Sequence, residues 1–143
     1  MSDAADAFEN SAALLFFNAT TWDGVAENDT TSPVTNWALS LHTSSAGDAG
    51  NQQTNEIGYT SYARITKART SGGFTVSAGV TTLASNGDFP AGTGGSGTAS
   101  HMGLGTLTTG TGTLYLHGAI SPSIVCGDGV TPRLTTATSF SIA

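Results

Sequence analysis

The chain has 143 residues, enough for one domain with a hydrophobic core. Only 10% of its residues are charged, against about 25% in typical soluble domains, and small neutral residues take their place. This composition argues against an all-helical bundle and against a disordered chain. The net charge of −6 argues against a nucleic-acid partner, and no apolar run approaches the roughly 20 residues of a membrane span. We therefore expect neither nucleic acid nor membrane as a partner.

The first segment is predicted to be a helix over about residues 3–17. Phe8, Leu15 and Phe16, together with alanines, recur at three- and four-residue spacing and form one apolar face. A helix of this length is marginal alone, so this face must pack on something. This face could pack on the sheet of its own chain, or it could pack on a neighbouring subunit or the capsid surface. A polar loop, residues 20–35, follows the helix.

After this loop the hydrophobic period changes from near four to two, which is typical of strands. Trp37, Leu39 and Leu41 fall on one face of the first strand and are expected to point into the core. Ser40 and His42 fall on the other face and are expected to point away.

Further alternating segments are separated by turn residues at regular spacing. They are residues 59–67, 74–78, 80–83, 101–107, 113–120 and 134–142. The sequence therefore predicts a mainly β fold, an antiparallel β-sandwich or jelly-roll-like domain with a short N-terminal helix. We expect one domain overall, with residues 1–35 as a helix and loop arm and residues 36–143 as the β-sandwich.

Three of the four basic residues, Arg64, Lys67 and Arg69, lie close together in one stretch, at and just after the end of the predicted strand of residues 59–67. The main interpretation is a solvent face that keeps an edge strand soluble, and the alternative is a basic strip that faces a partner. The spacing of Glu56 and Arg64 around a short segment also allows an ion pair, either across a turn or between adjacent subunits.

Tests for reactive groups give no catalytic residue, no cofactor site and no metal site. The Gly-x-Gly-x-x-Gly string at residues 92–97 lacks a preceding strand and a following helix, so it is interpreted as a flexible loop. His42, His101 and His117 show no metal-binding spacing, although strand histidines can still converge across a sheet or a subunit axis. Cys126 is the only cysteine and is interpreted as a small buried hydrophobe. We expect that the protein is not an enzyme.

Several strings spread over most of the chain carry a family resemblance. They lie at residues 8–10, 14–20, 37–43, 47–51, 55–59, 62–64, 69–74, 89–90, 94–97, 101–105 and 129–132. In these strings the chain resembles a family of small tailed-phage virion proteins, described as tail-fibre proteins and in part related to head-decoration or cement proteins. The resemblance implies a non-enzymatic structural role in a virion that is assembled in the cytoplasm of a bacterial host. The single cysteine and the absence of the basic N-terminal region of a secretory signal peptide agree with that compartment.

The leading functional hypothesis is a capsid decoration or cement protein that stabilises the head by binding the capsid surface. Its expected partners are the major capsid protein and itself, as a homotrimer, because icosahedral shells offer threefold sites. The candidate interface residues are Phe8, Leu15, Phe16, Arg64, Lys67 and Arg69. The first alternative is a tail-fibre or tail-tip adhesin domain. A carbohydrate-binding module ranks last, because only 8% of the residues are aromatic.

Overall fold

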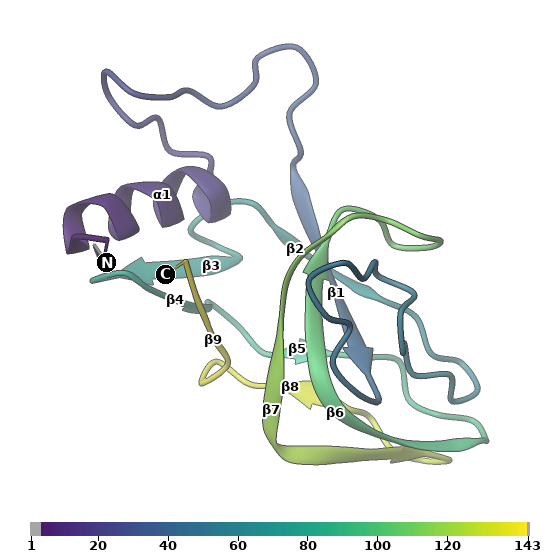
Figure 1. The fold of residues 1–143 in the computed structure, drawn as a ribbon. Helices are drawn as coiled ribbons and strands as arrows, with labels where there is room; N and C mark the ends of the chain where they lie inside the picture. Colours follow the sequence, from purple (N-terminus) through teal and green to yellow (C-terminus); the bar gives the residue numbers. More distant parts are fainter. Residues whose placement is uncertain (1–3, 143) are drawn as a thin grey trace. The chain divides into compact units, whose positions relative to one another are not determined.

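The computed structural model describes residues 4–142 and is mainly β, as expected (Figure 1). The elements of this part are α1 (Asp6–Asn18), β1 (Asn36–His42), β2 (Ile65–Ala68), β3 (Phe74–Ser77), β4 (Val80–Leu83), β5 (Gly87–Asp88), β6 (Ser96–Gly105), β7 (Leu114–Gly127), β8 (Arg133–Leu134) and β9 (Ser139–Ser141). The strands form sheets of order β2-β1-β6-β7, β3-β4-β9 and β5-β8. The N-terminal helix and the antiparallel pairing of the strands are both confirmed.

The chain divides into two compact units, each built from separate stretches of sequence. Within the described part, unit 1 holds residues 4–35, 68–86 and 135–142, and unit 2 holds residues 36–67 and 87–134. Residues 35 and 36 lie in different units. The two later stretches of unit 1, however, group with the helix and not with the remaining strands.

Unit 1 packs α1 against the sheet of β3, β4 and β9. Ala13 and Phe17 are the buried residues of the helix. The ring centroid of Phe17 lies 5.1 Å from that of Phe74 on β3 and 5.6 Å from that of Phe140 on β9. Aromatic rings at these separations contribute both buried area and edge contacts to a core. The core of unit 1 is therefore an aromatic cluster.

The prediction of which side of the helix is buried was wrong. Leu15 and Phe16 are only half-buried, and Phe8 is 51% exposed, with its ring in a T-shaped contact with Trp22 of the following loop. The helix carries apolar residues around much of its circumference, so spacing alone does not show which side meets the sheet. The residue at which the predicted helix begins lies outside the described part.

The carboxyl end of α1 is closed by the residues that directly follow it and by Arg69, which is distant in sequence. Ala19 takes a left-handed conformation, with φ of 54°, and the Thr20 N–H donates to the Leu14 carbonyl. The Arg69 guanidinium donates to the carbonyls of Leu15, at 2.6 Å, and Phe16, at 2.7 Å. A cation at this end also suits the helix dipole. Arg69 therefore fixes the end of the helix.

Unit 2 is organised around β1, which lies between β2 and β6 in the largest sheet. β1 and β6 are antiparallel, with Leu39 opposite Leu104 and Ser40 opposite Gly103. Leu39 and Leu41 are fully buried, and so are Ser40 and His42. The prediction that Ser40 and His42 point away from the core was therefore wrong, because the segment between β1 and β2 covers that face.

Candidate functional site

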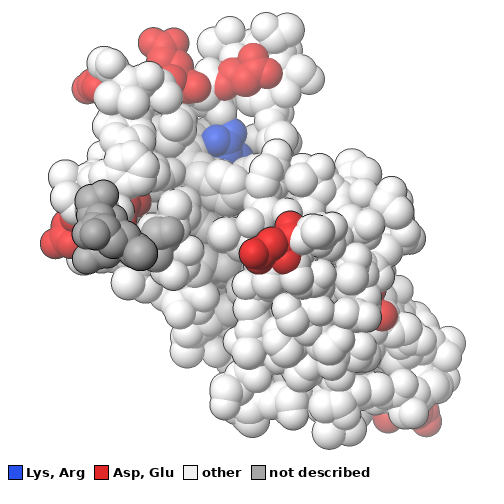
Figure 2. Space-filling model, in the orientation of Figure 1, with Lys and Arg blue, Asp and Glu red and all other residues white. Residues whose placement is uncertain are grey.

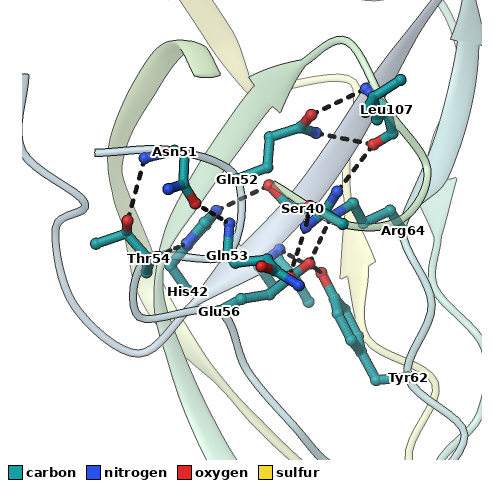
Figure 3. A network of polar contacts seen from close by, with 12 residues as sticks. Ser40, His42, Asn51, Gln52, Gln53, Thr54, Glu56, Tyr62, Arg64 and Leu107 are labelled. Atoms are coloured by element: carbon teal, nitrogen blue, oxygen red, sulfur yellow. Dashed lines mark hydrogen bonds and ion pairs between the residues drawn. The ribbon is translucent and has the colours of Figure 1, made fainter. Parts of the chain in front are cut away.

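A network of polar contacts lies over the second face of β1 (Figure 3). Arg64 and Glu56 form a bidentate ion pair. The distances from Arg64 Nε to Glu56 Oε1 and from Arg64 Nη2 to Glu56 Oε2 are both 2.7 Å. The Tyr62 hydroxyl donates to Glu56 Oε1 at 2.9 Å and accepts from the Leu41 N–H at 3.0 Å. The predicted ion pair is confirmed, and it forms within one chain.

The same network holds the turn between β6 and β7. Arg64 donates from Nη1 to the Leu107 carbonyl at 3.0 Å and from Nη2 to the Gly110 carbonyl at 2.8 Å. The buried side-chain amide of Gln52 pairs with both backbone groups of Leu107, at 2.9 and 3.0 Å. Two side chains far from the turn in sequence therefore fix its backbone.

Glycines make room for the Gln52 side chain. A Cβ added at Gly105 would lie 2.4 Å from Gln52 Cδ, and one added at Gly112 would lie 2.0 Å from Gln52 Oε1. Real Cβ atoms do not approach other atoms so closely, so both positions require glycine while Gln52 keeps this place.

Ser40 and His42 form a second hydrogen-bonded pair in the network (Figure 3). His42 Nδ1 lies 2.8 Å from the Thr54 carbonyl, which only accepts, so Nδ1 carries the hydrogen. His42 Nε2 then accepts from the Ser40 hydroxyl, 2.8 Å away. A Cβ at Gly103 would lie 2.7 Å from both groups, so the backbone of β6 closes the pair off. The pair resembles a nucleophile with its base, but it is fully buried and has no access for a substrate.

The buried histidine should make stability depend on pH. Burial lowers the pKa of His42, against smaller opposing effects of the Thr54 carbonyl and Glu56. Because the folded-state pKa lies below the unfolded value of about 6.5, His42 destabilises the folded state only as pH falls below about 6.5. We expect the free energy of unfolding in urea to drop by up to about 1.4 kcal/mol per pH unit between pH 6.5 and 5.

A His42→Gln variant supplies the control for this prediction, because it removes the titrating group. Its stability should change less than that of the wild type over the same pH range. An equal slope for the wild type and His42→Gln would contradict the assignment.

The other candidate ligands do not assemble into a metal centre. His42 and His101 are opposite each other on β1 and β6, and His117 on β7 is opposite Gly103. Residues 4–142 nevertheless contain no group of three or more His, Cys, Asp or Glu side chains placed to hold a metal ion. Cys126 is buried, as expected for a small hydrophobe. The glycine string at residues 92–97 runs from a loop into β6.

The candidate interface residues are distributed over both units. Of the six, only Phe8 is mainly exposed. Arg64 is only 7% exposed, so the prediction that it lies on a solvent-facing strip was wrong. Arg69 binds the carboxyl end of α1. A role in an interface stays a prediction for all six. The sequence analysis missed Gln52. The only hint of its role in the sequence is the presence of Gly105 and Gly112, which leave room for its side chain.

The model of one protein family, described as podophage GP4 fiber I protein gp80, matches residues 16–138. The chain belongs to this family. No curated protein matches it. Membership makes the protein a phage fibre protein and a virion component, as the resemblance in its sequence implied.

The family favours the tail-fibre alternative over the leading hypothesis of capsid decoration. The expected homotrimer followed from the threefold sites of a capsid. Both that trimer and binding to the major capsid protein stay predictions. No helix within residues 4–142 is long and apolar enough to cross a membrane.

Proposed function

We propose that the protein is a non-enzymatic folded part of a podophage tail fibre, held on the virion by contacts of its surface. The observation that carries this proposal is the family match over residues 16–138. Residues 4–142 show no internal repeat that would suit a fibre shaft, so we assign them to a segment of the fibre outside the shaft.

The chemistry of the molecule supports a structural role. Ser40, His42 and Arg64 of the polar network are buried, 15% of the Glu56 side chain is exposed, and these four side chains bond to one another or to neighbouring backbone. Much of the surface visible in Figure 2 carries neither acids nor bases. A surface with few charges packs against other proteins without desolvating many ions.

The experiment is localisation and counting on intact virions. Fab fragments against this chain are imaged on particles, and copies are counted by quantitative mass spectrometry against the major capsid protein. The proposal expects label on the tail and a few to a few dozen copies. Label over the faces of the head, with hundreds of copies, would overturn it and restore the decoration hypothesis.

A further inference from the structure

A tight turn in the loop after α1 presents an apolar side chain to solvent. Trp22 and Ala26 exchange two backbone hydrogen bonds, of 2.8 and 3.0 Å, and the Val25 N–H donates to the Trp22 carbonyl at 2.9 Å. Gly24, with φ of 74°, allows the chain to reverse, and a Cβ added to it would meet no atom within 4 Å. Val25 lies beside it and is 66% exposed. The turn therefore has a defined backbone and an open, apolar tip.

Contacts with the rest of unit 1 fix this loop at two points. The Trp22 ring lies in a T-shaped contact with the half-exposed Phe8 of α1, at a centroid distance of 5.3 Å. Arg69, which closes α1, also donates to the Asn28 side chain of the loop. We call the side chains of Phe8, Trp22 and Val25 the Trp22 surface. Exposed apolar side chains that lie together mark interaction sites, and a preformed surface loses little conformational entropy on binding.

Acidic side chains border the Trp22 surface. Asp6 precedes Phe8 by two positions, Asp23 and Glu27 flank Val25 at two positions on either side, and all three acids are exposed. Figure 2 shows acidic side chains gathered at the top, over the loop that follows α1. The described part of unit 1 contains one base, Arg69, and five acids, which are Asp6, Glu9, Asp23, Glu27 and Asp29. The border of the surface is therefore negatively charged.

The sign of this charge indicates which occupant fits. Nucleic acids and anionic lipids are themselves negative and are repelled. A second copy would bring the same acids, and three of its four bases are already bound. Those bases are Arg64 to Glu56, Arg69 to the end of α1, and Arg133 to Asp88. The complementary surface has an apolar centre and a border of lysine and arginine.

We propose that the Trp22 surface docks on a basic surface with an apolar centre that belongs to a different protein of the virion. This proposal rests on the proposed function, because that function places the partner in the virion. Burial of Val25 and Phe8 supplies affinity, while the acids at the border steer and orient the approach. The docking element is therefore the helix and loop of unit 1, and the strands of unit 2 are left for other contacts.

The first test measures binding of the purified full chain to particles assembled without it, in about 10 to 150 mM salt. Bound chain is counted by quantitative mass spectrometry and located with Fab fragments. The wild type should bind to the tail, and more weakly as salt rises. Val25→Ser should weaken binding about tenfold and leave the salt dependence unchanged. Asp23→Asn combined with Glu27→Gln should weaken binding about tenfold at low salt and reduce the salt dependence.

Matched variants in unit 2 give the controls. Val125→Ser changes a valine that is 70% exposed, and Asp48→Asn combined with Asp128→Asn removes two exposed acids. Both should bind like the wild type, and thermal unfolding checks that every variant folds. Tail binding that is equal for the wild type and the turn variants would overturn this inference alone. Binding of the wild type to the faces of the head would overturn the proposed function, and a wild type that binds nowhere would overturn both.

Carbodiimide cross-linking of intact virions identifies the occupant, because this reagent joins carboxylates to lysine amines in direct contact. We expect Asp23 or Glu27 to be joined to a lysine of a different virion protein. A link from these acids to Lys67 of a second copy would show that copies cover one another, and would contradict the proposal. So would their failure to link to another protein in virions where Asp48 or Asp128 does so.

Discussion

Replacing Arg64 with alanine is expected to cost about 3–5 kcal/mol of the free energy of unfolding. The loss is large because Arg64 is buried and its guanidinium donates four hydrogen bonds. Two go to Glu56, and one each goes to the Leu107 and Gly110 carbonyls. Its removal leaves the Glu56 carboxylate in the interior with only the Tyr62 hydroxyl. Urea unfolding measures the loss, and hydrogen exchange should locate it in unit 2.

The pair Arg133 and Asp88 is a matched control with similar chemistry. Its guanidinium also contacts both carboxylate oxygens, but about half of each side chain is exposed. Arg133→Ala should cost much less of the free energy of unfolding than Arg64→Ala, because water screens an exposed ion pair. Combining Glu56→Ala with Arg64→Ala should cost clearly less than the sum of the two single changes. Additive costs would contradict a buried, coupled pair.

Replacing Phe17 with alanine is expected to cost about 3–5 kcal/mol. Phe17 is fully buried and touches both Phe74 and Phe140, so its removal leaves a cavity at the centre of the aromatic cluster. Thermal unfolding measures the cost, and the increase in hydrogen exchange should concentrate in unit 1.

Phe8→Ala, on the same helix, is the control for that change. Phe8 is half-exposed and has one ring contact, with Trp22, so its loss should cost about 1 kcal/mol or less. Equal costs for Phe8→Ala and Phe17→Ala would show that the orientation of α1 described above is wrong.

The first strand shows how far the sequence alone could reach. The alternation of Trp37, Leu39 and Leu41 correctly predicted a strand and its buried apolar face. Alternation also predicted that the second face of the strand is exposed, and this was wrong. A strand with one face in solvent and a strand whose second face is buried by polar residues show the same alternating pattern. What covers that face is a long segment without regular structure, whose path depends on contacts such as Gln52 with Leu107.

The polar network was predictable only in part, for the same physical reason. Glu56 and Arg64 are near in sequence, and their pairing could be anticipated from spacing. The carbonyls of Leu107 and Gly110 that complete the site are more than forty residues away from Arg64. The partner of Arg69 likewise proved to be the end of a helix that precedes it by more than fifty residues. Backbone groups carry no mark in a sequence, so such contacts come only from the fold.

The arrangement of the units constrains the order in which the protein can form on the ribosome. Unit 1 needs α1, made first, and β9, made after the last strand of unit 2. All of unit 2 has therefore been synthesised before the sheet of unit 1 can receive its third strand. Until then the Phe17 cluster lacks Phe140 and exposes apolar surface to solvent. Contacts between such distant segments form slowly, so the incomplete unit 1 is open to aggregation and to capture by chaperones during this interval.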